Sequence, residues 1–195
     1  TTKSASVKNP ATKKGAAKPA TTSIVAARKA PSTAKTSAKQ PILVGILTGS
    51  PNDLSTVVKV RDTLTELGIA SEIIVASAHR TPDKVIAYID RAHREGVQVL
   101  IGCAGMAAHL AGVIAGHTRL PVIGLPLSGG IVSGLDALLS TVQMPPGVPV
   151  ATVAVDGSKN AAMLAVRILA LKFPAINEAL EKAARDLRLA FDEDG

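Results

Sequence analysis

The sequence is poor in aromatic residues and in cysteine, and each shortage excludes a class of protein. Aromatic side chains make up 2% of the 195 residues, with no tryptophan, one tyrosine and two phenylalanines. Many single-strand nucleic-acid binders stack bases on aromatic rings, so this composition argues against a binder of that type. The single cysteine, Cys103, excludes an internal disulfide and is typical of a reducing compartment, which predicts a cytoplasmic location.

Long apolar runs are also missing from the chain. No run reaches the roughly 18 residues expected of a membrane-spanning helix, so we expect no membrane association. The start of the sequence shows no apolar stretch of the kind found in signal peptides. Hydrophobic residues nevertheless make up 47% of the chain, which is ample for a buried core. Because aromatics are scarce, that core is expected to consist of alanine, valine, isoleucine and leucine.

Acidic residues are absent from positions 1–40, where eight lysines and Arg28 give a charge of +9. The other 155 residues carry 13 basic and 15 acidic side chains, a net charge of −2. The overall charge of +7 therefore belongs to the first segment alone. The rest of the chain lacks the basic surface expected of a nucleic-acid-binding domain.

Residues 1–40 are predicted to form a disordered basic tail. Threonine, serine, alanine, lysine and proline dominate, and Val7, Ile24 and Val25 are the only larger apolar side chains. Such a segment buries too little surface to offset the entropy of ordering it. Three interpretations remain open: a solvated tail without a partner, a tail that attracts nucleic acid or another polyanion, and a transit peptide. The single arginine and the lack of helical amphipathicity argue against the last.

From residue 41 onward the pattern alternates between buried strands and helices. Strands are predicted at 42–47, 69–76, 97–101, 121–125 and 150–155, and helices at 53–67, 81–96, 106–115, 135–142 and 160–171. Continuous apolar runs are typical of strands that are buried on both faces. Their alternation with helices predicts a single α/β domain over residues 41–195, with helices on both sides of a parallel sheet.

A last helix is expected at about 175–191, after a break at Phe173-Pro174. Its apolar positions follow a 4-3-4-3 spacing with charged residues between them, and they are Ile176, Leu180, Ala183, Leu187 and Ala190. This seam needs an apolar surface to cover it. On so small a domain, we expect that surface to belong to another subunit.

Three segments rich in small and polar residues follow predicted strands. Ser77-Ala78-His79-Arg80-Thr81-Pro82 brings together a hydroxyl, an imidazole and a guanidinium. Thr48–Asp53 and Gly102–His109 occupy equivalent strand-to-helix corners. Ligands of open α/β sheets bind outside the carboxyl ends of the strands, where such corners meet. The three corners therefore predict a site for an anionic, nucleotide-like ligand with acid–base chemistry beside it.

The residue types at the first two corners suggest separate roles. The second corner contains His79, and imidazole is the side-chain type best suited to proton transfer at neutral pH. The planar fork of Arg80 suits a phosphate. Ser50 lies where a helix begins, so its hydroxyl and the backbone N–H groups favour phosphate as well. Asp53 either accepts hydrogen bonds from ribose hydroxyls or simply caps the following helix.

The third corner consists of small residues, which lets the backbone approach a planar ring. His109 is predicted to lie one or two turns into its helix, where a structural role competes with a catalytic one. Cys103 ends a strand without an adjacent general base, which favours a core position over a nucleophilic one. His93 and His117 are interpreted as solvated residues. The four histidines lack metal-ligand spacing, so no metal is expected.

Four ordered motifs resemble the aminoimidazole ribonucleotide carboxylase family. They are Val44–Ser50, Ser77–Asp83, Ala107–Leu110 and Gly134–Pro145, within a resemblance that covers about 42–171. The likeness is greatest to the N5-carboxyaminoimidazole ribonucleotide mutase branch, which acts in purine biosynthesis. Arg80 after His79 favours this branch, because the direct-carboxylase branch tends to carry lysine there.

This resemblance implies a flavodoxin-like three-layer α/β/α sandwich that assembles as a homo-octamer, acts on a small ribonucleotide and uses no cofactor or metal. His79 would be the general acid and base. The substrate-binding residues would be Ser50, Asp53 and Arg80 at the ribose phosphate, and Ala104, Gly105 and His109 at the base and carboxylate, with Ser77 and Ala78 beside them. Met106 and Ala111 depart from the family's usual glycine and proline, and we expect these departures to bear on substrate preference more than on reaction class.

The implied reaction is decarboxylation of the carbamate followed by recarboxylation at C4 of the aminoimidazole. Direct carboxylation of aminoimidazole ribonucleotide with CO₂ is the nearest alternative. A non-catalytic flavodoxin-like module that binds a nucleotide or flavin fits the fold but leaves His79 without a role. A polyanion-binding or scaffold protein that acts through the basic tail is a further alternative.

Overall fold

The computed structural model describes residues 40–192. The predictions for the basic tail therefore lie outside the described residues, apart from Gln40. Within 40–192, no helix has the length and apolar character required to cross a membrane.

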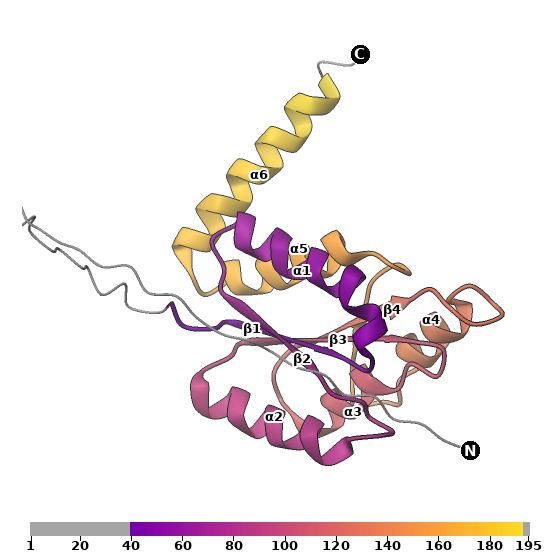
Figure 1. Cartoon of the computed structure of the whole chain (residues 1–195). Helices are drawn as coiled ribbons and strands as arrows, with labels where there is room; N and C mark the ends of the chain where they lie inside the picture. Colours follow the sequence, from indigo (N-terminus) through magenta and orange to yellow (C-terminus); the bar gives the residue numbers. More distant parts are fainter. Residues whose placement is uncertain (1–39, 193–195) are drawn as a thin grey trace, which may run out of the picture. The chain divides into compact units, whose positions relative to one another are not determined.

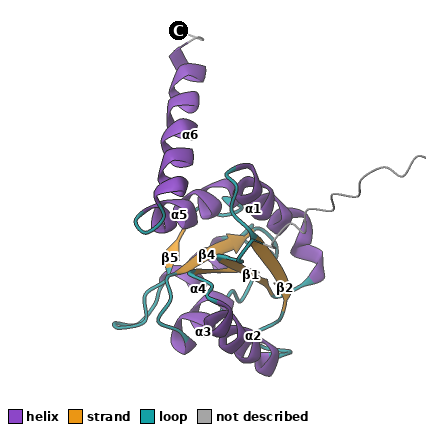
Figure 2. Ribbon diagram, turned by 90° about the vertical axis from the view of Figure 1, so that its left-hand side faces the viewer, coloured by secondary structure: helices purple, strands orange, loops and turns teal. Residues whose placement is uncertain are grey.

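The described chain is built on one five-stranded parallel sheet (Figure 2). The strands are β1 (Val44–Thr48), β2 (Ser71–Val75), β3 (Val99–Gly105), β4 (Val122–Leu127) and β5 (Ala151–Thr152). Their order is β2-β1-β3-β4-β5, and every pair is parallel. The chain moves outward from β1 to β2 and then crosses back to β3, so the switch point lies between β1 and β3.

Helices cover both faces of the sheet (Figure 1). One face carries α1 (Leu54–Glu66) and α5 (Ser158–Ala170), and the other carries α2 (Pro82–Glu95), α3 (Leu110–His117) and α4 (Leu135–Val142). This arrangement confirms the predicted flavodoxin-like α/β/α sandwich. The strand order is also that of flavodoxin-like folds.

Two aliphatic cores hold the three layers together. Val57 and Leu64 of α1 lie in the first core, and Val85 and Ile89 of α2 lie in the second. Tyr88 is the only aromatic residue of the described chain that is buried, which confirms the expectation of an aliphatic core. Each fully buried side chain of this size contributes about 1.5–3 kcal/mol relative to exposure.

Three glycines let the helices approach the sheet on the face of α2, α3 and α4. A Cβ on Gly45 would overlap the Tyr88 hydroxyl, and one on Gly124 would overlap the Thr141 methyl group. A Cβ on Gly102 would lie 2.8 Å from the Ala111 Cα. The third glycine sets the position of α3, which begins at the third predicted corner.

Two predicted element boundaries are wrong at this corner. Strand β3 continues to Gly105, four residues beyond the predicted end, and α3 begins at Leu110 rather than Met106. Met106 has a φ of +55°, a left-handed conformation, so it is not itself part of a right-handed helix. His109 therefore lies immediately before α3, not one or two turns into it.

The last two elements also differ from expectation. Strand β5 is only two residues long and has β4 as its single neighbour, so the predicted strand over 150–155 is too long. Helix α6 (Pro174–Asp192) packs Ile176 and Leu180 against the first core, whereas Leu187 is 55% exposed. The first half of the predicted seam thus contacts its own subunit.

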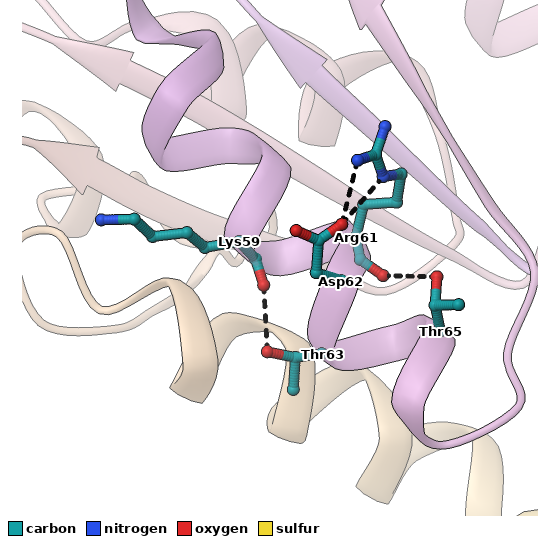
Figure 3. Close-up of polar contacts among 5 residues, drawn as sticks. All are labelled: Lys59, Arg61, Asp62, Thr63 and Thr65. Atoms are coloured by element: carbon teal, nitrogen blue, oxygen red, sulfur yellow. Dashed lines mark hydrogen bonds and ion pairs between the residues drawn. The ribbon is translucent and has the colours of Figure 1, made fainter.

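The outward face of α1 satisfies its polar groups within the helix (Figure 3). The Thr63 and Thr65 hydroxyls donate to the carbonyl oxygens of Lys59 and Arg61, each at 2.9 Å. Arg61 also pairs with Asp62 at 2.9 Å. These contacts lie on a solvent-facing surface, and none of the residues involved lines the pocket described below.

Candidate active site

The three predicted corners meet in one pocket of about 520 Å³ at the carboxyl ends of the strands, a volume typical of small-molecule sites. Eight of the nine predicted site residues line it: Ser50, Asp53, Ser77, Ala78, His79, Arg80, Ala104 and Gly105. The ninth, His109, is not in the lining but touches His79. The pocket lies at the β1/β3 switch point, where an α/β sheet binds its ligand.

At the end of β1, Ser50 begins a 3-10 turn over Pro51–Asp53. Its backbone is extended, and its Oγ accepts the Asn52 N–H at 3.2 Å. The hydroxyl hydrogen remains available to a ligand, because that contact uses only a lone pair. This geometry presents a donor at the start of a helical segment, as the sequence predicts for a phosphate site.

Asp53 precedes α1 but makes no capping hydrogen bond with its side chain. Its Oδ2 lies 3.4 Å from the hydroxyl oxygen of Thr48, which is fully buried. Burial raises the pKa of Asp53, while the Thr48 hydrogen bond and the charge of Arg80 oppose that rise. The alternative that the Asp53 side chain simply caps α1 is therefore wrong. The carboxylate lines the pocket instead, where partial burial removes some of its favourable hydration.

Replacing Asp53 with asparagine is expected to separate function from stability. Because burial raises its pKa, the ionised carboxylate disfavours the folded state at neutral pH, and this cost fades as pH falls through the raised pKa. The variant should thus have a higher Tm at pH 7 but no advantage in acid. Loss of a charged acceptor should lower kcat/KM about 10- to 100-fold. A lower Tm at pH 7 would contradict the argument.

At the end of β2, hydrogen bonds fix the corner that holds His79 and Arg80. The Ser77 hydroxyl oxygen accepts the backbone N–H of Arg80 at 3.2 Å, and the Ser77 N–H donates to Thr81 Oγ1 at 2.8 Å. Arg80 Nη2 donates to the carbonyl oxygen of Gly49, which joins this corner to that of β1. Within residues 40–192, Arg80 forms no ion pair with a carboxylate, so its exposed guanidinium is available to an anion.

His79 and His109 form a direct pair, which the sequence analysis did not foresee. His79 Nε2 lies 2.9 Å from His109 Nδ1, and the rings meet edge to face with centroids 5.0 Å apart. One nitrogen donates and the other accepts, so a single proton lies between them in the neutral pair. His79 Nδ1 has no hydrogen-bond partner in the described chain and is the nitrogen left for a substrate.

At the end of β3, Ala104 and Gly105 line the pocket, while the preceding Cys103 is fully buried beneath them. Burial, reinforced by the nearby charge of Asp53, raises the pKa of the Cys103 thiol. A neutral, inaccessible thiol is a poor nucleophile, which confirms the core position predicted for it. Met106 lines the same wall.

Sequence reasoning missed a fourth wall, formed by Ser128 and Gly129 after β4. The Ser128 N–H donates to Asp156 Oδ1 at 3.0 Å, which fixes the start of this loop. The rule that placed the other corners also applies to it, because Ser128 follows a parallel strand.

The other two histidines lie outside the pocket, as predicted. His93 is exposed and contacts Thr118, and His117 is exposed and contacts the Val113 carbonyl oxygen. Over residues 40–192, no group of three or more histidine, cysteine, aspartate or glutamate side chains is arranged to hold a metal ion.

Comparison with known proteins identifies the family of this chain. Residues 43–189 match the protein family described as AIR carboxylase. The chain is 49% identical over 151 residues to the N5-carboxyaminoimidazole ribonucleotide mutase of Pyrococcus horikoshii. The aligned residues cover 77% of this chain and 85% of that protein. The Thermotoga maritima mutase is 46% identical over 162 residues, covering 77% of this chain and 95% of the relative.

A solved structure and a differently named relative complete the comparison. The crystal structure of Treponema denticola PurE has a TM-score of 0.73 and 29% identity, covering 77% of this chain and 94% of that one. A Schizosaccharomyces pombe protein named phosphoribosylaminoimidazole carboxylase is 47% identical over 146 residues, which are 73% of this chain but 26% of that protein.

Proposed function

Because the chain belongs to the AIR carboxylase family, we propose that it interconverts N5-carboxyaminoimidazole ribonucleotide and 4-carboxy-5-aminoimidazole ribonucleotide in purine biosynthesis. The observation that carries this proposal is the His79–His109 pair, which lies beside an anion-binding Arg80 in a pocket of nucleotide size. A module that only binds a flavin or nucleotide would leave the pair without a role.

The ribose phosphate binds at the first two corners. Arg80 offers its guanidinium, and Ser50 offers its hydroxyl at the start of the turn. Asp53 accepts hydrogen bonds from ribose hydroxyls. The base then lies against Ala104 and Gly105, where the absence of large side chains lets a flat ring approach the backbone.

The reaction proceeds in two halves. In the first, the bond between the exocyclic nitrogen and the carbamate carbon breaks, its electron pair returns to nitrogen, and nitrogen takes a proton from His79. The CO₂ released stays in the pocket. In the second half, the electron-rich C4 attacks CO₂, and His79 removes the C4 proton. General acid–base catalysis of this kind contributes about 10²–10⁴-fold, and retention of CO₂ supplies proximity.

His109 lets His79 act in both directions. When His79 Nε2 donates to His109 Nδ1, His79 Nδ1 is a base in the neutral ring. When His109 Nδ1 donates instead, His79 Nδ1 carries the hydrogen and is a donor. For this exchange to balance, the exposed His109 ring takes a solvent proton at Nε2 when its Nδ1 gives up the shared proton, and releases it when the shared proton returns. His79 Nδ1 thereby changes from donor to base between the two halves, as the reaction requires.

The test is interconversion of the two carboxylated nucleotides, followed by ultraviolet absorbance without added bicarbonate or ATP. Turnover well above the enzyme-free rate is expected. Absence of turnover by the folded protein would overturn the proposal.

Direct carboxylation of aminoimidazole ribonucleotide is the second candidate, favoured by the name of the Schizosaccharomyces pombe relative. The two reactions separate when the carbamate and aminoimidazole ribonucleotide are compared at equal concentration with bicarbonate varied. The mutase should use the carbamate efficiently and the unsubstituted nucleotide poorly. Efficient, bicarbonate-dependent use of the latter would assign the carboxylase reaction and leave the fold and His79 unchanged.

Assembly as a homo-octamer is part of the same proposal. An exposed apolar surface on and before α4 supports it, formed by Ile131, Val132, Leu135, Leu139 and Val142. Five large apolar side chains gathered on one short segment are typical of a surface that another subunit covers. The cytoplasmic location predicted from the single cysteine, and the role of the basic tail, remain predictions.

Replacing Leu139 with glutamate is expected to reduce the mass of the assembly, because an unpaired charge in an apolar contact is costly. Light scattering of the purified protein measures the mass. Thr65→Glu on the polar face of α1 is the matched control and should leave it unchanged. An unaltered mass for the Leu139 variant would place the α4 surface in solvent.

A further inference from the structure

Met106 occupies a backbone conformation that favours glycine. Its φ is +55°, and only two other non-glycine residues of the described chain, Ser133 and Asp156, have positive φ. Asp156 has a visible reason, since its carboxylate accepts the Ser128 N–H. The Met106 side chain, in contrast, has no strong hydrogen-bonding group that could stabilise this backbone conformation. A residue kept in an unfavourable conformation at a site points to a use for its side chain.

The Met106 side chain lies at the mouth of the pocket. It is 60% exposed, yet it belongs to the lining together with Gly105, Ser128 and Gly129. Its Cγ lies 3.4 Å from the position that a Cβ on Gly130 would take, so it reaches the loop that follows β4. The side chain therefore spans from the β3 wall toward the β4 wall.

The chemistry of methionine suits a cover at this place. The side chain is unbranched, apolar and adaptable, so it can follow the outline of a bound ring. It has no titratable group and takes no part in proton transfer. What it can change is the access of water to the pocket and the escape of a small apolar molecule from it. In the proposed reaction, CO₂ is such a molecule.

We propose that Met106 closes the pocket mouth over the bound aminoimidazole and retains CO₂ between the two halves of the reaction. This proposal rests on the proposed function. It assigns Met106 a positioning role that decides whether CO₂ adds to C4 or leaves for solvent, where it becomes bicarbonate. A glycine here would relieve the backbone and open the mouth.

The experiment supplies the carbamate substrate in buffer that contains ¹³C-labelled bicarbonate. It measures the carboxylated product, the free aminoimidazole ribonucleotide and the label in the product, corrected for enzyme-free loss of CO₂. For Met106→Gly we expect the ratio of free nucleotide to product to rise by about tenfold, with more label incorporated. Met106→Leu keeps most of the apolar volume and should restore most of the retention.

Two controls keep the result specific. The Tm of Met106→Gly should equal or exceed that of the unaltered protein, because glycine adopts a positive φ without steric strain. Leu171→Ala removes an exposed apolar side chain at the end of α5, outside both the pocket lining and the α4 surface, and should leave the ratio unchanged. An unchanged ratio in Met106→Gly would overturn this inference alone. If the unaltered protein does not convert the carbamate, the proposed function fails and this inference falls with it.

Discussion

Replacing His79 with asparagine is expected to lower kcat by about 10²–10⁴-fold, the usual contribution of general acid–base catalysis. Asparagine retains polarity and approximate size but cannot accept and release a proton near neutral pH. Ribonucleotide binding should persist, because the residues proposed to contact the phosphate are Ser50 and Arg80, which line the same pocket and are unchanged. Steady-state kinetics for kcat, with calorimetry for binding, measures the two effects separately.

Two further variants define what the His79 result means. His93→Asn changes an exposed histidine outside the pocket and should leave kcat unchanged. His109→Asn keeps His79 but removes the proton that the two rings share, so kcat should fall less and its pH profile should shift. Activity of the His79 variant within tenfold of the unaltered enzyme would remove this residue from the catalytic role.

The sheet was predictable because its central strands are buried, β1 and β4 along their whole length and β3 over its first five residues. The five residues of β1 are all buried, and the run of apolar residues at 42–47 signals this directly. The same reasoning places ligand-binding corners at strand ends, and eight of nine predicted site residues line one pocket. These features depend on local pattern and on the parallel topology, both of which are visible in sequence.

What could not be predicted depends on backbone conformation and on contacts between distant segments. Met106 is an ordinary helix former, and nothing in its neighbours reveals that its φ is positive. The pairing of His79 with His109 joins positions 30 residues apart, and it requires the exact end of β3 and the start of α3. The Leu180 contact with the first core likewise depends on how α6 leaves α5.

The second large effect is expected from Gly102→Ala, which tests how closely α3 lies on the sheet. The added Cβ would lie 2.8 Å from the Ala111 Cα and 3.0 Å from the Ala111 nitrogen. Both are backbone atoms, so no side-chain rotation relieves the overlap and α3 itself must move. Overpacking of this kind costs about 1–3 kcal/mol. In a chain of this size, that lowers Tm by about 2–12 °C.

The same displacement should reach the active site, because His109 lies at the start of α3 and contacts His79. We therefore expect kcat to fall together with Tm in Gly102→Ala.

Gly116→Ala, within α3 itself, is the matched control. Its Cβ would meet nothing within 4 Å, and alanine favours helix over glycine by about 1 kcal/mol. That control should be as stable as the unaltered protein or more so, with full activity. Calorimetry and steady-state kinetics on the two variants compare the outcomes, and a Gly102 variant with unaltered Tm would show that α3 has room to accept a methyl group. A fall in Tm without a fall in kcat would instead mean that the His79–His109 contact survives movement of the helix.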